Sequence, residues 1–401
     1  MIHKFAAKNF FSIKDSGADF EVNRNAPDTT GYTKDLNRRV SKIMTLIGPN
    51  ASGKTNILKI LPFLQYFIVA SFNLKPDEEI PYEPFLFTSK KDDPTELSVL
   101  FSCKEILYEY TLKLNPIQVL SEKLRKYNIK TKQFSILFDR LWNKTKDDYY
   151  SNLTNFKIPT KVANIIKKRK NASVISIAAQ IDHKLSTEII AYWSAFESNV
   201  MMLGKHDHFE LSDEAARYYF EHPEAKKLAE DLLTRFDLGL TKLQIEKHIS
   251  KSESGKQKIF YTPLGFHKGE KKNYPLPFFY ESHGTKCLFS LLSQITSVLL
   301  NGGIAILDEF DADLHPHMLP ELIDLFTSEE LNPKNAQLIF STHHHEILNK
   351  LDKYQIILIE KNQETGITEA WRLDTLGSSV RMDDNYYSKY ITGVYGGVPE
   401  L

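Results

Sequence analysis

Short apolar runs of strand length mark both ends of the chain. In roughly the first hundred residues these runs are continuous or alternate with polar positions, as expected for strands: Ile2–Asn9, Lys42–Ile47, Leu97–Phe101 and Tyr108–Leu114. After about residue 259, similar runs are separated by segments of helix length: Ile304–Leu307, Gln337–Phe340, Gln355–Glu360 and Thr368–Leu373. Alternating strands and helices are typical of a mostly parallel sheet, so the sequence predicts an α/β fold.

The middle of the chain has a different pattern. Between about Pro116 and Lys258 the apolar residues follow a helical period, as in Leu228, Leu232 and Phe236, with charged residues between them. We therefore expect an N-terminal lobe over residues 1–115, a mostly helical insertion over 116–258 and a C-terminal lobe over 259–401. The two lobes are expected to form one sheet-bearing domain.

Composition narrows the class of protein. A chain of 401 residues is long enough for two or three domains. Basic and acidic residues each total 51, so no global positive field marks a general nucleic-acid binder, and any such contact has to be local. Only Cys103 and Cys287 occur, which favours a reducing compartment. With neither a signal-peptide pattern nor an apolar run of about 18 residues, we expect a cytoplasmic protein outside the membrane.

A glycine-rich segment follows the predicted strand Lys42–Ile47. It fits the pattern G-x-x-x-x-G-K-[ST] and comprises Gly48, Pro49, Asn50, Ala51, Ser52, Gly53, Lys54 and Thr55. Such a loop surrounds phosphate oxygens with backbone N–H groups at a helix N-terminus, while Lys54 reaches the β- and γ-phosphates and Thr55 offers a hydroxyl to Mg²⁺. A chance glycine-rich turn is the alternative, which the strand before it and the helix after it disfavour.

The apolar run Ile304–Leu307 ends in two carboxylates, Asp308 and Glu309. Asp308 can hold Mg²⁺ directly or through water, and Glu309 can polarise the water that attacks a γ-phosphate. Taken alone, the pair could equally be solvated acids at the end of a strand. The phosphate loop upstream favours the functional interpretation.

Two further segments carry candidate chemistry. Ser282 and Gly284 precede an apolar stretch that predicts a helix, so they could bind an anion, or Ser282 could be a simple helix cap. His343 ends the strand Gln337–Phe340 and could contact a γ-phosphate or the attacking water. The nearby His344, His345, His315 and His317 raise the alternative of a metal cluster, but their spacing is not that of a zinc site.

Taken in order, these segments resemble the motif set of ABC ATPases: phosphate loop, signature, acid pair, D-loop and switch histidine. The insertion stands where SMC-type and recombination-repair ATPases carry a coiled coil, although it is much too short for one. Four segments further resemble the bacterial OLD-like and AbiL/RloA-like ATPases of abortive-infection and anti-phage systems: Lys8–Ser12, Pro84–Phe87, Asp308–Pro316 and Tyr395–Pro399. The similarity spans nearly the whole chain.

The resemblance implies an ABC-type P-loop ATPase head assembled from both chain ends, with ATP and Mg²⁺ as cofactors. It assigns the nucleotide to Gly48, Pro49, Asn50, Ala51, Ser52, Gly53, Lys54, Thr55 and Asn56. Thr55 and Asp308 would hold the metal, Glu309 would be the catalytic base, and His343 would be the switch histidine. Asp311 falls in the D-loop, and the signature that closes over the nucleotide of a second subunit would be Ser282, Gly284 and Thr285.

The sequence departs from the family pattern in three places. His283 replaces the usual first glycine of the signature. The glutamine of the Q-loop has only Gln118 as a candidate, by position. The stretch after His343 is too short for the C-terminal nuclease domain of OLD nucleases.

These observations predict an ATPase that closes around ATP as a homodimer or larger even oligomer and regulates a separate effector, a nuclease or toxin, in phage defence. No second catalytic cluster is evident, so the chain itself is not expected to be the toxic enzyme. The alternative is a DNA-repair or DNA-maintenance ATPase that clamps DNA through two basic runs, unless these are solvated surface: Lys167-Lys168-Arg169-Lys170 and Lys123, Arg125, Lys126. A transporter ATPase is a third, less favoured class.

Overall fold

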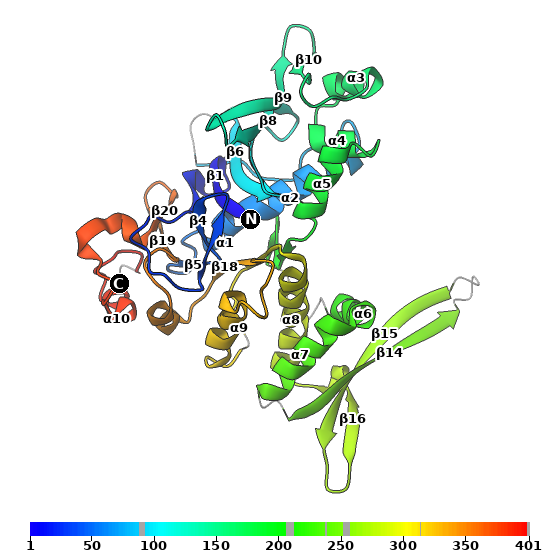
Figure 1. The fold of residues 1–401 in the computed structure, drawn as a ribbon, viewed down its shortest axis with the longest axis vertical. Coiled ribbons are helices and arrows are strands. Elements are labelled where there is room, and N and C mark those ends of the chain that lie inside the picture. The colour runs from blue at the N-terminus through cyan, green and yellow to red at the C-terminus, as the bar shows by residue number, and fades with distance from the viewer. Residues whose placement is uncertain (88–92, 206–211, 237–238, 252–256, 313, 399–401) are drawn as a thin grey trace.

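A single large sheet organises the protein in the computed structural model, which describes residues 1–87, 93–205, 212–236, 239–251, 257–312 and 314–398 (Figure 1). Its 13 strands follow the order β10-β9-β8-β7-β6-β1-β2-β20-β19-β5-β18-β17-β11. Their bounds are β1 Ile2–Phe10, β2 Ile13–Asp19, β5 Ile43–Ile47, β6 Thr95–Cys103, β7 Ile106–Leu114, β8 Val119–Asn128, β9 Gln133–Asn143, β10 Asp148–Asn152, β11 Glu197–Ser198, β17 Ile304–Leu307, β18 Gln337–Ser341, β19 Ile356–Lys361 and β20 Thr368–Arg372.

Helices cover both faces of this sheet. They are α1 Lys54–Leu58, α2 Ile60–Ala70, α3 Thr160–Lys168, α4 Val174–Ala179, α5 Lys184–Trp193, α6 Ser212–Glu221, α7 Pro223–Arg235, α8 His283–Asn301, α9 Met318–Thr327 and α10 Tyr386–Ile391. Short 3₁₀ turns are η1 Ser71–Asn73, η3 Phe278–Tyr280, η4 His345–Lys350 and η5 Leu373–Ser379. One hydrophobic core contains residues of α2, α4 and α5, and a second contains residues of α7, α8 and α9.

The parallel strands form the centre of the nucleotide-binding half. β5 is buried at every position and pairs in parallel with β18 on one side and β19 on the other. β18 pairs in turn with β17, and β17 with β11. Strands buried on both faces need continuous apolar runs, which explains why the sequence predicted β5, β17, β18 and β19 correctly.

Both ends of the chain meet in this one sheet, as predicted. β2, near the N-terminus, lies beside β20, near the C-terminus, with Ile13 opposite Thr368. The buried side chain of Gln337 reinforces the junction: its Nε2 donates to the carbonyl of Ile2 at 2.9 Å and its Oε1 accepts from the N–H of Ile2 at 2.6 Å. The fold is therefore α/β and assembled from segments far apart in sequence.

The segment 116–258 is not mostly helical, and that expectation is wrong. Strands β8, β9 and β10 continue the main sheet before α3–α5 begin, and the later part contains a long strand, β14 (Leu240–Lys251). The inward side of β8 and β9 carries Glu122 and Arg140, both fully buried and paired at 2.7 Å, so polar residues occupy positions where alternation would require apolar ones. The boundary at 258/259 falls within β15 (Gln257–Lys268), and the division into three parts stays a prediction.

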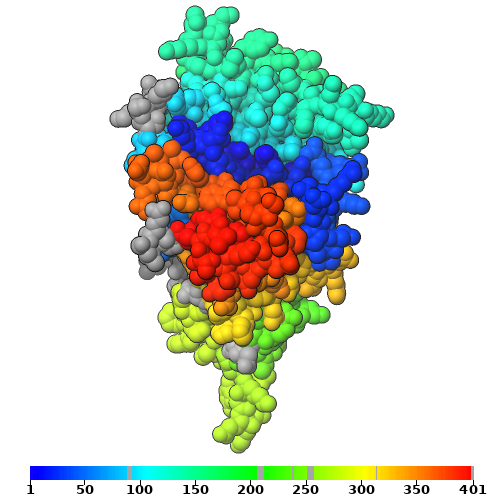
Figure 2. All heavy atoms as spheres, turned by 90° about the vertical axis from the view of Figure 1, so that its left-hand side faces the viewer, coloured from blue at the N-terminus to red at the C-terminus, as the bar shows by residue number. Residues whose placement is uncertain are grey.

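An arm projects from the body beside α6 and α7. It consists of β14, β15 and β16 (Asn273–Pro277), which form a separate antiparallel sheet. Figure 1 shows this sheet extending away from the main sheet, and Figure 2 shows part of it as a narrow projection at one end of the molecule. We call residues 240–277 the arm. Two small hairpins, β3 Tyr32–Asp35 with β4 Arg38–Ser41 and β12 Val200–Met201 with β13 Gly204–Lys205, complete the strands.

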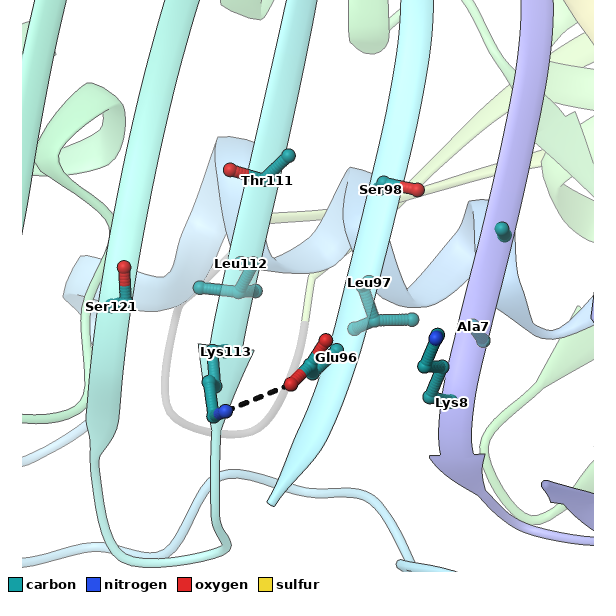
Figure 3. A pocket seen from close by; sticks show the side chains of 10 residues that line it. Ala7, Lys8, Glu96, Leu97, Ser98, Thr111, Leu112, Lys113 and Ser121 are labelled. Atoms are coloured by element: carbon teal, nitrogen blue, oxygen red, sulfur yellow. Dashed lines mark hydrogen bonds and ion pairs between the residues drawn. The ribbon is translucent and has the colours of Figure 1, made fainter. Parts of the chain in front are cut away.

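The open face of β1, β6, β7 and β8 is balanced in charge. Figure 3 shows a shallow hollow there, lined by small side chains such as Ser98 and Thr111, with Lys113 paired to Glu96 at 2.8 Å. Further along the same strands Lys123 lies 3.4 Å from Asp139, and Arg125 is paired with Glu109. Lys123 and Arg125, which the sequence offered as DNA contacts, are thus engaged with carboxylates.

Candidate nucleotide site

The phosphate loop lies between β5 and α1, as the sequence predicts. Ala51 and Gly53 adopt positive φ angles of 62° and 105°, which turn the backbone tightly toward the start of α1. The side chain of Lys54 folds over the loop, and its Nζ donates to the carbonyls of Gly48 and Pro49 at 2.8 and 2.9 Å. Burial lowers the pKa of the Lys54 ammonium, and the negative charges of Asp308, Glu309 and Asp311 partly offset that shift.

Two glycines are required here because the loop packs closely against β19 and β20. A Cβ on Gly48 would lie 2.1 Å from the carbonyl oxygen of Ile359, and one on Gly53 would lie 2.1 Å from Oγ1 of Thr368. Any other residue would push the loop away from these strands. The motif's glycines therefore fix the loop's position as well as its backbone turn.

A polar network holds the loop from the side of the C-terminal strands. Thr368 Oγ1 donates to the carbonyl of Ser52 at 3.0 Å and lies 2.7 Å from Ser12 Oγ. Asn56 Nδ2 donates to the same Ser12 oxygen at 2.7 Å. The Asn56 side chain thus supports the loop, and Ser12 and Thr368, which the sequence did not single out for this role, belong to the same support.

A pocket of about 650 Å³ opens beside the loop. Its walls come from Pro49, Asn50, Ala51 and Ser52 on one side and from the β19–β20 turn, including Asn362, on the other. The pocket places the four predicted loop residues at the surface of one cavity. Its size is in the range of small-molecule and cofactor sites.

The predicted metal ligands meet although they are 253 residues apart in the chain. Thr55 Oγ1 donates to Asp308 Oδ2 at 2.6 Å, and Ser341 donates its hydroxyl proton to the other carboxylate oxygen of Asp308. Asp308 is almost fully buried, with 4% of its surface exposed. A hydroxyl and a carboxylate are the hard oxygen ligands that Mg²⁺ prefers, so these residues fit that ion. Within the described ranges, no group of three or more His, Cys, Asp or Glu side chains is placed to hold a metal by itself.

Glu309 lies next to Asp308 but points to a different set of partners. Its Oε2 accepts from Lys205 Nζ at 2.9 Å, and its Oε1 lies 4.0 Å from His343 Nε2. The hydrogen bond from Lys205 is the main cause that holds the pKa of the Glu309 carboxyl below its usual range, against the opposing effect of burial. Glu309 is therefore ionised and able to accept a proton from water.

Lys205 was not expected at the site, because it lies in the two-residue strand β13 and in no recognisable motif. Pairing with a lysine weakens a carboxylate as a proton acceptor, so replacing Lys205 by alanine should raise basal ATP turnover a few-fold. The conservative variant Lys205→Arg keeps the positive charge and should stay near the wild-type rate. The measurement is the steady-state rate of ATP turnover of both variants. A large loss of turnover in Lys205→Ala would show instead that the lysine assists hydrolysis.

The D-loop residue and the switch histidine are in contact. The carboxylate of Asp311 accepts from the backbone N–H of His343, with distances of 3.2 and 3.3 Å to its two oxygens. The side chain of His343 thereby sits beside Glu309 at the carboxyl ends of β17 and β18. Asp313 and Pro399, which belong to the segments that carry the family resemblance, lie outside the described residues.

The signature residues stand apart from this cluster. Ser282 caps α8: its Oγ accepts from the N–H of Thr285 at 3.1 Å and lies 2.8 Å from Thr285 Oγ1. No hydrogen bond or ion pair joins Ser282, Gly284 or Thr285 to the described residues of the phosphate loop. His283, at the unusual position, lies 3.4 Å from Cys287 Sγ, one turn further along the helix.

The candidate for the Q-loop, Gln118, is misplaced. It lies in the turn between β7 and β8, where its N–H bonds Asn115, and six strands separate β8 from β5. The polar amide beside the acid pair is instead Asn199, just after β11. Its Nδ2 donates to the carbonyl of Asp308 at 2.9 Å, and its Oδ1 accepts from the N–H of Asp308 at 2.8 Å. Because β11 has only two residues, no pattern in the sequence predicted this strand or the asparagine that follows it.

The remaining histidines have other surroundings. His345 packs against Tyr390 with ring centres 4.9 Å apart, and burial lowers its pKa. His344 lies 3.9 Å from Glu346, and His315 contacts His317 with ring centres 5.0 Å apart. These contacts agree with the structural rather than the metal-binding interpretation of the histidine-rich segments.

One helical stretch, Lys54–Asn73, is long and apolar enough to cross a membrane, but 61% of it is buried inside the protein. It packs under the sheet in the first hydrophobic core. Its apolar character is therefore that of a buried core helix.

Two solved structures align over most of both chains. An Smc head bound to the C-terminal winged-helix domain of ScpA is 14% identical, covering 94% of this chain and 98% of that one with a TM-score of 0.43. An Smc head with an extended coiled coil, bound to the C-terminal domain of ScpA from Pyrococcus furiosus, is 12% identical, covering 94% and 97% with a TM-score of 0.36.

A search of curated proteins found no match. Residues 43–349 match the family described as "AAA domain, putative AbiEii toxin, Type IV TA system". The match includes the phosphate loop, the signature segment, the acid pair and the switch histidine. The chain belongs to this family of AAA-domain, P-loop ATPases.

Proposed function

We propose that this protein is an ABC-type ATPase that binds ATP with Mg²⁺, closes around it as a homodimer or larger even oligomer, and hydrolyses it. The observation that carries the proposal is the convergence of Lys54, Thr55, Asp308 and Glu309 on one site from opposite ends of the chain. A lysine, a hydroxyl, a buried carboxylate and a second, ionised carboxylate are the groups that phosphoryl transfer requires.

Each residue has a separate task in this proposal. The loop N–H groups and Lys54 bind the phosphates, and Glu309 orients and deprotonates the attacking water. Mg²⁺ held by Thr55 and Asp308 would supply positive charge to the β- and γ-phosphates. His343, beside Glu309, would contact the γ-phosphate or the water, and its backbone link to Asp311 would join that contact to the D-loop.

The isolation of the signature supports the proposed dimer. A serine hydroxyl and exposed N–H groups at the start of the long helix α8 form an anion site that has no phosphate loop of its own subunit in contact. A second copy of the chain supplies that loop in the proposed assembly. Closing on ATP then brings two composite sites together across a two-fold axis.

We further infer that the ATPase is the sensor or regulatory subunit of a cytoplasmic anti-phage system of the AbiL/RloA-like group. The family description supports a link to toxin–antitoxin systems. In the described residues, no group of three or more His, Cys, Asp or Glu side chains could hold a metal ion for a metal-dependent nuclease, which supports a separate effector. The two cysteines, Cys103 and Cys287, are both buried, which is compatible with a reducing cytoplasm.

The existence of a separate effector is tested by assaying the chain with and without the product of the adjacent gene. The isolated protein, given ATP and Mg²⁺, should cleave neither DNA, RNA nor tRNA, whereas toxicity or cleavage should appear with the product of the adjacent gene and disappear with Lys54→Ala. Robust cleavage by the chain alone, lost in a variant outside the ATP site, would show that the chain is the toxin that its family description names. Full phage protection without any neighbouring gene would contradict the regulatory role.

The alternative function is that of a repair ATPase that clamps DNA. It has less support, because several residues of the two basic runs predicted to contact DNA are paired with carboxylates. Lys123 and Arg125 are paired on the sheet face, and Lys170 lies 2.9 Å from Asp147. Stimulation of hydrolysis by duplex DNA, lost when Lys167 and Lys168 are changed to glutamate, would favour it.

A further inference from the structure

The arm concentrates positive charge in a chain whose overall net charge is zero. Residues 240–277 contain eight lysines, three glutamates and neither arginine nor aspartate, whereas the whole chain has a formal net charge of zero. The side chains of six of these lysines are described, and none of the six forms an ion pair or hydrogen bond with a described residue: Lys242, Lys247, Lys258, Lys268, Lys271 and Lys272. In the basic runs near β8 and α3, by contrast, Lys123, Arg125 and Lys170 are paired with carboxylates.

The strand register sorts the arm's side chains onto two faces. Lys242 stands opposite Phe266, and His248 stands opposite Phe260, so these four share the outer face. The inner face lies against the helices, where Tyr261 packs on Phe220 of α6 with ring centres 5.1 Å apart. On the outer face Lys242, Lys258 and Phe260 are exposed, whereas Leu264 on the same face is buried.

Aromatic rings and cations alternate on that outer face. Lys242 Nζ lies 5.3 Å from the ring centre of Phe266. His248 stacks on Phe260 at 5.1 Å with planes 18° apart, and Phe260 keeps 45% of its surface exposed. The one described acid on this face is Glu246, which accepts from Gln244 at 3.3 Å.

We propose that the outer face of the arm binds a single-stranded polynucleotide. Lys242, Lys258 and Lys268 supply cations along the strands for the phosphates, and Phe260 and Phe266 supply flat surfaces on which unpaired bases stack. The charge complements a polyanion, and exposed rings favour a single strand because the bases of a duplex are already stacked on one another.

The base of the arm touches the signature. His267 Nε2 lies 2.6 Å from Glu281 Oε1, and Glu281, 6% exposed at its side chain, immediately precedes Ser282. Phe278, at the end of β16, packs on Phe289 of α8 with ring centres 4.6 Å apart. A strand bound on the arm would thus be linked by direct contacts to the start of α8. This coupling rests on the proposed ATPase function, whereas the binding itself does not.

Binding is tested without nucleotide, by fluorescence anisotropy of labelled oligo(dT) and oligo(U) of about 20 nucleotides, a length that covers a typical single-strand site. The variant Lys242→Glu/Lys258→Glu/Lys268→Glu should bind at least about tenfold more weakly. The alanine version should make the dependence of log K on log salt shallower by about two, as expected for three lost phosphate contacts. Phe260→Ala should cost about tenfold through lost stacking.

The matched control changes the same number of exposed lysines at the other end of the molecule, as Lys161→Glu/Lys167→Glu/Lys168→Glu on α3. It should bind within about twofold of wild type. Arm variants should keep basal ATP hydrolysis, which shows that they fold, and Lys54→Ala should keep polynucleotide binding, so failure of the ATPase proposal is distinguishable from failure of this one.

Three results would overturn the binding proposal: no measurable binding of either oligonucleotide, binding to duplex alone, or an equal loss in the α3 control. For the coupling, the polynucleotide should change ATP turnover at least about twofold in wild type, and His267→Ala should retain binding but lose that change. Binding with no effect on turnover in wild type would refute the coupling.

Discussion

Glu309→Gln should slow ATP hydrolysis at least about a hundredfold while leaving ATP binding intact. The change keeps the shape of the side chain and its distance from His343 but removes the charge that accepts a proton from water. Loss of a general base typically costs between a hundred- and ten-thousandfold in rate. The expected signature is a fall in kcat with little change in the affinity measured at equilibrium.

Two further variants are compared with Glu309→Gln. Lys54→Ala should abolish tight ATP binding, because the ammonium that faces the phosphates is lost. Glu369→Gln makes the same chemical change on an exposed acid of β20 and should behave as wild type. Binding by calorimetry and turnover by phosphate release separate the three outcomes, and near-normal turnover in Glu309→Gln would remove its assignment as the base.

A mixture of two inactive variants should recover activity. Lys54→Ala destroys the phosphate loop of its own subunit, and Ser282→Arg destroys the signature that the subunit lends to its partner. In a heterodimer both defects fall in one composite site, and the other site is intact. A random equal mixture should then regain about a quarter of the wild-type sites, since half of the dimers are mixed and each carries one working site.

The control for this experiment mixes two variants whose defects lie in the same half of the site. Lys54→Ala mixed with Glu309→Gln leaves every site of the heterodimer with one broken component, because both residues belong to the same half of the site. That mixture should show no recovery. Equal recovery in both mixtures, or none in either, would contradict a signature that acts across subunits.

The central fold could be predicted because its strands are buried on both faces. β5, β17, β18 and β19 read as continuous apolar runs, and the phosphate loop follows one of them at a fixed spacing. The antiparallel strands were harder to find. β8 and β9 bury the ion pair Glu122–Arg140, so their inward positions do not look apolar in the sequence.

The residues of the site likewise divide into those that the sequence predicted and those that it did not. Lys54, Thr55, Asp308 and Glu309 stand in motifs whose spacing reflects local backbone geometry. Asn199, just after the two-residue strand β11, and Lys205, in the two-residue strand β13, reach the acid pair through tertiary contacts, and no local pattern marks them. Ser12, in the turn between β1 and β2, and Thr368, in β20, likewise support the loop from opposite ends of the chain. Sequence thus located the residues that define a motif, and missed those that only the folded chain brings to it.

The central claim is that two copies of this chain close around ATP, and it is tested most directly by the mass of Glu309→Gln in solution. Slow hydrolysis should trap the closed state, so sedimentation should show a species of at least twice the monomer mass with ATP and Mg²⁺. The larger species should be absent with ADP, and absent again when Ser282→Arg is added. The same mass with ATP, with ADP and without nucleotide would contradict the account.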